Sequence, residues 1–352
     1  MHPPPQDKIA RAYEDNQCGW IVHSCYFILF FPKSTHFVIS IMVNYFNLLR
    51  VSSASISSFL ISILISISIN AQDIEIQEIG ERMAVLSGTG TNILVRQSAN
   101  GEVMIIDGGL EEYSEQTQDA VGKLLLERWG NDTAMATLLI NTHWHPEQTG
   151  LNTFLGNNGA TIFAHENTRQ WLTTPINRPW ENSTFEPLPE SAQPKETFYH
   201  YGELNHGGTT VQYGYLRQAH TDGDMYVYFP EENVLHGGGV ISNEGWPLMD
   251  WWTGGWIGGL ANSLEVLLEI VNEETVIVPA NGPLMSQSDL LAMRDVYATI
   301  FQRISGGFRA ANSVEDTLSD EPTAEFDDQY GDPEGFIRRS HESLIPHYTP
   351  DA

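Results

Sequence analysis

The chain has 352 residues, a formal net charge of −28 and 41% hydrophobic residues, which is the composition of a globular protein with an acidic surface. This charge excludes nucleic acid as the expected partner or substrate, because binding phosphates needs clustered Lys and Arg that release counterions. The length permits one large domain or two ordinary domains.

Residues 1–71 are predicted to be a leader that precedes the folded protein. Residues 1–41 have no sustained hydrophobic period and are treated as an unreliable extension. Residues 42–50 are positively charged and residues 51–69 are apolar, so residues 42–71 have the layout of a signal peptide. We expect cleavage and a secreted or periplasmic protein; the alternative is a membrane anchor, since the apolar stretch approaches the roughly 20 residues of a spanning helix.

The mature chain is expected to lack disulfides and thiolate metal ligands, because both cysteines lie in the leader. From residue 72 onward, short apolar runs separated by glycine-containing turns predict sequential strands at residues 83–86, 92–96 and 103–106. Ser114 is predicted to cap a helix that runs to residue 129 on an i, i+3, i+4 apolar stripe. A buried strand at residues 135–140 follows, an order typical of an α/β layer whose sites lie beyond the strand ends.

Two histidines, His143 and His145, follow that strand in the loop N-T-H-W-H-P-E-Q-T-G. Zinc binds neutral imidazole nitrogens, and three protein ligands with one open position define a catalytic site. His220, in Q-A-H-T-D-G-D after an alternating run at residues 209–216, is the candidate third ligand. For an isolated H-x-H pair, hydrogen-bonded structural histidines would be an equally weighted alternative.

These motifs resemble the metallo-β-lactamase superfamily, whose first motif reads T-H-x-H-x-D-H-x-G and is followed by a third His. The resemblance extends from about residue 83 to residue 297. It implies a four-layer αββα sandwich formed by a domain at residues 72–310, with His143, His145 and His220 as metal ligands. It also implies that Asp107 orders the metal loop, although Asp-Gly-Gly is equally typical of a simple turn, and that His165 is structural rather than a ligand.

The four residues that would hold a second metal in this family are all different here. Glu147 replaces an Asp, Gln148 a His, Gly239 the later Asp and Asn281 the final His. The resemblance therefore implies one zinc ion instead of two. By position, Glu147 would act as general base, and Gln148 and Asn281 would donate hydrogen bonds to an oxyanion.

The rest of the chain contributes elements around this centre. Residues 175–194 are predicted to be a long loop beside the site, where such loops often act as lids. Asp222 and Asp224 flank a glycine; a turn and supporting role is favoured over a general base or metal ligand. The tryptophan-rich residues 246–256 would form either an aromatic pocket wall or core packing. Further strands are predicted at residues 161–164, 225–229, 233–235 and 276–278, helices at 165–172, 260–271 and 290–304, and an acidic tail without chemistry at 311–352.

The sequence thus predicts a mononuclear zinc hydrolase, secreted or periplasmic, that activates water against a small ester, lactone, thioester or amide, β-lactams included. Its partner would be a small-molecule substrate, with no membrane contact after signal cleavage. The alternative is a catalytically degenerate member of the fold that binds a ligand or partner. The histidine triad favours the first interpretation, and the four replaced ligands favour the second.

Overall fold

The computed structural model describes residues 74–132 and 135–349, which belong to one unit of the chain, Ile69–Ala352. The predicted extension and signal peptide lie outside the described residues. No helix in the described ranges is both long and apolar enough to cross a bilayer.

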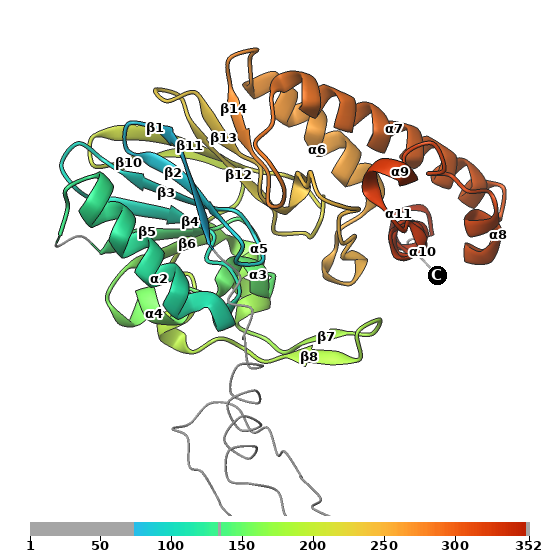
Figure 1. Ribbon diagram of the computed structural model, residues 1–352. Helices are drawn as coiled ribbons and strands as arrows, with labels where there is room; N and C mark the ends of the chain where they lie inside the picture. Colours follow the sequence, from blue (N-terminus) through green and yellow to red (C-terminus); the bar gives the residue numbers. More distant parts are fainter. Residues whose placement is uncertain (1–73, 133–134, 350–352) are drawn as a thin grey trace, which may run out of the picture. The chain divides into compact units, whose positions relative to one another are not determined.

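The N-terminal half forms a seven-stranded sheet in which the metal loop follows a central strand (Figure 1). The first four strands pair antiparallel, whereas the β4–β5, β5–β6 and β6–β9 pairs are parallel. The predicted strands are confirmed with shifts of only a residue or so at their ends. The strands, in sheet order, are β1 (Glu75–Gly80), β2 (Met83–Ser87), β3 (Ile93–Gln97), β4 (Val103–Ile106), β5 (Ala136–Asn141), β6 (Thr161–His165) and β9 (Glu196–Phe198).

The second sheet has five strands and faces the first across a buried core. Because side chains alternate along a strand, residues such as Leu94, Ile106 and Phe163 meet Val227 and Phe229 of the other sheet. The opposite face of the first sheet packs against helices through Leu86, Ile105 and their neighbours. The strands are β10 (Tyr201–His206), β11 (Thr209–Tyr215), β12 (Met225–Phe229), β13 (Val234–His236) and β14 (Val276–Val278).

Helices cover the outer face of each sheet, which makes the predicted four-layer αββα sandwich (Figure 1). On the first sheet lie α2 (Ser114–Lys123) and α4 (Asn152–Asn157), and on the second α6 (Ile257–Ile270) and α7 (Gln287–Arg309). Two short helices, α3 (Pro146–Thr149) and α5 (Glu166–Leu172), follow β5 and β6. Helices α6 and α7 pack on the second sheet through buried apolar residues such as Leu264 of α6 and Ile300 of α7.

The helix boundaries correct three details of the sequence interpretation, the first of which is that α6 begins at Ile257, three residues before the predicted start. Ser114 is the first residue of α2 rather than its N-cap, because a 3₁₀ turn at Glu111–Tyr113 runs directly into the helix; its hydroxyl accepts from Gln118 instead (3.0 Å). Helix α7 begins three residues before the predicted start, since Ser286 and Asp289 form a capping box there.

Part of the predicted loop at residues 175–194 is a β-hairpin. Strands β7 (Ile176–Arg178) and β8 (Ser183–Phe185) pair antiparallel, and a 3₁₀ turn follows at Glu190–Ala192. Strands of three residues are too short to show an alternating pattern in sequence. Arg178 at the end of β7 is buried against Trp144 of the metal loop, with its guanidinium carbon 4.9 Å from the ring centroid.

The acidic C-terminal residues, as far as residue 349, form helices that pack against the core of α6 and α7. Phe336 and Leu344 belong to the same buried core as α6 and α7. Phe336 stacks on Trp246 with centroids 4.8 Å apart, and Tyr330 stacks on the same ring at 4.5 Å. These contacts fix one of the tryptophans of residues 246–256. The helices are α8 (Val314–Ser319), α9 (Asp327–Tyr330), α10 (Glu334–Glu342) and α11 (Ile345–Tyr348).

Truncating the buried aromatic side chain of α10 tests this packing. We expect Phe336→Ala to lower the free energy of unfolding by about 3–5 kcal/mol, because it removes a fully buried ring and leaves a cavity. The measurement is urea denaturation, with Ile345→Ala, at an exposed position, as the control. Equal midpoints for both variants would show that the C-terminal helices contribute little to the fold.

Candidate metal centre

The metal loop, residues 142–145, is held in place by the carboxyl group of a residue that directly follows the neighbouring strand β4. Strands β4 and β5 are parallel, so the ends at Ile106 and Asn141 reach the same edge of the sheet. Asp107, directly after β4, accepts hydrogen bonds from the backbone N–H and the hydroxyl of Thr142, both at 2.8 Å. The structure confirms that Asp107 orders the loop.

The three predicted ligands meet at this edge. His143 and His145 lie on the β5–α3 loop, and His220 lies on the loop between β11 and β12. Their ring centroids are 4.6 to 4.7 Å apart, and each ring offers a nitrogen within 4.8 Å of the other two. All three side chains are buried. In the described part of the chain, this is the one group of three or more His, Cys, Asp or Glu side chains placed to hold a metal ion.

The hydrogen bonds of the three rings leave nitrogens without a protein partner. His143 Nδ1 lies 3.2 Å from the Thr142 hydroxyl, and its buried Nε2 has no partner. His145 uses Nε2 for Asp250, which leaves Nδ1 for another ligand. Neither ring nitrogen of His220 has a hydrogen-bond partner. An unsatisfied buried polar atom costs about 1–3 kcal/mol, and a metal cation would satisfy all three rings, so these residues fit a metal ion.

Burial keeps these rings uncharged. Removal from water lowers the pKa of all three histidines, that of His220 to about 4. The positive charge of Arg178 and repulsion among the rings lower the pKa of His143 and His145 further. Neutral imidazole is the form that binds metals, so the site is ready for a cation at neutral pH.

Asp250 supports the centre and was not predicted from the sequence. Its carboxylate is fully buried and bonds His145 Nε2 at 2.9 Å, while the other oxygen accepts from the backbone N–H of Thr253 (3.2 Å). A carboxylate on the outer nitrogen of a ligand histidine fixes the ring's orientation and raises its basicity. The available signal was one acidic residue inside the tryptophan-rich residues 246–256.

The predicted second-site residues line the same cavity as the triad. This cavity has a volume of about 170 Å³ and is bordered by Glu147, Gln148, Gly239 and Asn281 together with the histidines and Trp246. Gly239 lies so close that a Cβ there would stand 2.2 Å from His220 Nδ1 and 2.7 Å from His143 Cε1. A carboxylate side chain at this position would displace the histidine rings.

Two neutral amides stand where metal ligands are expected, and both are engaged by the protein. Gln148 Nε2 donates to the Thr91 hydroxyl (3.1 Å), and its buried Oε1 has no partner. The amide nitrogen of Asn281 faces the carbonyl oxygens of Gly90 and Ala280, at 3.1 Å each. Both N–H groups of Asn281 are therefore used, whereas Gln148 keeps one N–H. The hydrogen bond from Gln148 to an oxyanion stays a prediction.

The other acidic and histidine candidates have supporting contacts. Asp224 accepts from the backbone N–H of Thr221 (2.6 Å) and lies 3.9 Å from His220 Nδ1, in agreement with the favoured turn and supporting role. Asp222 accepts from the Trp171 indole (2.6 Å), and burial raises its pKa to about 6. His165 bonds the Tyr199 carbonyl (3.1 Å), which confirms that it is structural.

The αββα sandwich with its buried histidine triad is the fold of a protein with a candidate metal centre. A family model described as the metallo-beta-lactamase superfamily matches residues 87–280, more than half of the chain. The chain therefore belongs to the metallo-β-lactamase superfamily. A search of curated proteins finds no match.

Solved structures share the fold at low sequence identity. The metallo-beta-lactamase from Pontibacter korlensis is 18% identical, with a TM-score of 0.50 over 64% of this chain and 99% of that chain. The stereoselective inverting sec-alkylsulfatase Pisa1 from a Pseudomonas species is 13% identical, with a TM-score of 0.59 over 79% of this chain. The match spans about half of the sulfatase, 51% of its length.

Removing the charge of Asp250 tests its role in metal binding. We expect Asp250→Asn to weaken metal affinity about 10- to 100-fold, because the bond that orients His145 loses its carboxylate. Competition with a chromogenic chelator measures this. Asp222→Asn is the matched control, because that acid bonds Trp171 instead of a ligand histidine. Equal affinity in both variants would contradict a supporting role for Asp250.

The carboxyl of Asp107 predicts a pH dependence of stability in the metal-free protein. Burial raises its pKa from 3.8 to about 8, so between about pH 4 and pH 8 the folded chain holds a proton that the unfolded chain has released. The free energy of unfolding then falls as pH rises through this window. We expect Asp107→Asn to flatten that decline in denaturation curves after chelation; an unchanged slope would show that Asp107 is ionised in the folded protein.

Proposed function

We propose that the protein is a mononuclear zinc hydrolase acting on a small ester, lactone, thioester or amide. The observation that carries the proposal is the set of three buried, neutral imidazoles whose free nitrogens converge beside Glu147. The replacement of a carboxylate by Gly239 supports one metal ion in place of two. The donor set of three imidazoles suits zinc.

Zinc held by His143 Nε2, His145 Nδ1 and one nitrogen of His220 would lower the pKa of a coordinated water to about 7 and polarise a substrate carbonyl. Asp250 holds His145 in the ring orientation that presents Nδ1. Thr142, fixed by Asp107, positions the loop that carries the first two ligands. The protein thus prepares the geometry before the substrate arrives.

Glu147 is the group suited to move a proton. It is half-buried and lines the cavity, and in the described ranges no hydrogen bond or ion pair engages its carboxylate. An unengaged carboxylate beside the attacking water can accept its proton, a role that adds about 10²- to 10⁴-fold in rate. The remaining N–H of Gln148 would stabilise the negative charge on the substrate oxygen.

The size of the histidine cavity favours small acyl groups, and β-lactams form a subset of the proposed substrates. The leader of the sequence supports a secreted or periplasmic location, with the small-molecule substrate as partner and no membrane contact after cleavage. The unpartnered histidine nitrogens favour this function over a degenerate binder.

Metal content is the first test. We expect about one zinc per chain, by elemental analysis after dialysis of the protein from Gln72 onward, and we expect His143→Ala to lose it. Two zinc ions per chain would contradict the single-metal proposal. No zinc in a folded wild-type protein, checked by circular dichroism, would favour the degenerate binder.

The general base is tested separately. With zinc content unchanged, we expect Glu147→Gln to lower kcat for the best substrate of an ester, lactone and lactam screen about 10²- to 10⁴-fold. Glu127→Gln, which removes the same charge at an exposed position, serves as the control. Unchanged hydrolysis by Glu147→Gln would refute the assignment of the base.

A further inference from the structure

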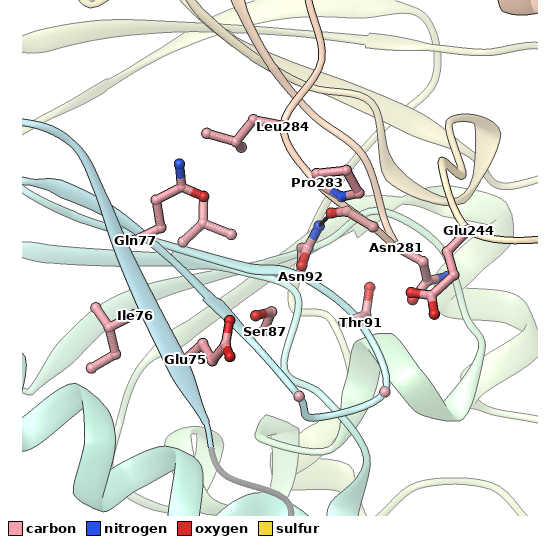
Figure 2. A pocket seen from close by; sticks show the side chains of 14 residues that line it. Glu75, Ile76, Gln77, Ser87, Thr91, Asn92, Glu244, Asn281, Pro283 and Leu284 are labelled. Atoms are coloured by element: carbon pink, nitrogen blue, oxygen red, sulfur yellow. Dashed lines mark hydrogen bonds between the residues drawn. The ribbon is translucent and has the colours of Figure 1, made fainter.

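A second, larger cavity continues from the histidine cavity. Its volume is about 650 Å³, and it is bordered by β1, by the turn between β2 and β3, and by residues 281–284. Figure 2 shows Glu75 and Gln77 of β1 on one side, Pro283 and Leu284 on the other, and Glu244 beside Asn281 at one end. We call this cavity the β1 groove.

The β1 groove and the histidine cavity share part of their lining. Gly90, Glu244 and Asn281 border both. A substrate whose carbonyl lies at the histidines can therefore extend its other end past Glu244 into the groove. The groove's volume is in the range of small-molecule binding sites, about 300–1,000 Å³.

Apart from the proposed zinc ion, the charged side chains that line this path are all acidic. Glu147 lines the histidine cavity, Glu75 the groove, and Glu244 both. Among the described residues that line the two cavities, none is Lys or Arg. The nearby Arg178 does not line either cavity; it is buried against Trp144 of the metal loop and bonds Glu181 at 2.8 Å. Carboxylates lining a concave site attract cations and repel anions.

An unused acceptor lies at the lining of the histidine cavity. The Thr91 hydroxyl donates to the Ala280 carbonyl (2.9 Å), so its oxygen must accept from Gln148 Nε2. This fixes the amide and leaves Gln148 Oε1 buried without a donor, on a side chain that is only 3% exposed. A ligand N–H group would satisfy it, whereas a carboxylate or sulfate would not.

We infer that the β1 groove binds the positively charged arm of the substrate, so that the enzyme prefers esters or amides with an ammonium group over anionic ones. The inference rests on the proposed function for the reaction itself. The ammonium end lies between Glu75 and Glu244, with N–H groups available to acceptors along the path. The arm's methylene groups pack against Leu284, and the carbonyl stays at the histidines.

Three matched p-nitrophenyl esters test the preference. Their arms have equal length and end in a dimethylammonium group, an isopropyl group or a carboxylate. We expect kcat/KM at low salt, corrected for spontaneous hydrolysis, to be at least about tenfold higher for the ammonium than for the carboxylate ester. The ratio should shrink as salt is added, because exposed charges are screened. Equal values for the three esters would overturn the inference.

Binding is measured independently of turnover with three hydroxamic acids that carry the same arms. Calorimetry on the zinc-loaded protein should give a Kd at least about tenfold lower for the ammonium than for the carboxylate compound. Turnover without discrimination would leave the hydrolase and refute the groove assignment. Discrimination among the hydroxamates without turnover of any ester would support the groove and refute the hydrolase.

A double variant locates the effect. Glu75→Gln with Glu244→Gln should reduce the ammonium-to-carboxylate ratio several-fold in both assays. Glu127→Gln, which changes charge at an exposed position of the helical layer, should keep the wild-type ratio. A wild-type ratio in the double variant would show that the preference, if present, arises outside the β1 groove.

Discussion

The structure depends on burying three imidazole rings that have no protein partner for their inner nitrogens. This arrangement is unfavourable in an empty protein, because desolvated polar atoms lose their hydrogen bonds to water. It becomes favourable only when a cation accepts the three lone pairs. Two features hold the rings in place despite this unfavourable desolvation. They are the parallel pairing of β4 with β5 and the two hydrogen bonds from Thr142 to Asp107. The fold therefore presents a metal site rather than a hydrogen-bonded histidine cluster.

The central sheets and the triad could be predicted because their signals are local. Alternating runs and glycine turns located the main strands, and His143, His145 and His220 each follow such a run. Asp250 could not be found this way, because it lies 105 residues from His145 in sequence and reaches it through the 3₁₀ turn at Trp251–Thr253. The hairpin of β7 and β8 was hidden by its short strands. The C-terminal helices were hidden by their acidic surface, since only a few buried residues, such as Phe336, connect them to the core.

Two of the residues that replace the expected second-metal ligands, Gln148 and Asn281, belong to a connected network. Gln148 bonds Thr91, Thr91 bonds the Ala280 carbonyl, and the Asn281 amide faces the Gly90 carbonyl. These bonds tie α3, the β2–β3 turn and the segment after β14 together. In a two-metal member of the family, the second ion would tie such segments. Neutral amides achieve this without a charge that needs a counterion, so the replacements at Gln148 and Asn281 belong to one network.

The same replacements change what the site can recognise. A second cation would attract anionic groups to the mouth of the histidine cavity, whereas here Glu147 and Glu244 occupy that region without a neighbouring Lys or Arg in the lining. The likeness to a sec-alkylsulfatase and a metallo-beta-lactamase concerns the fold, and function depends on the site that each fold carries. In the proposed binding mode, the acidic lining of the β1 groove opposes a sulfate or carboxylate at the far end of the substrate.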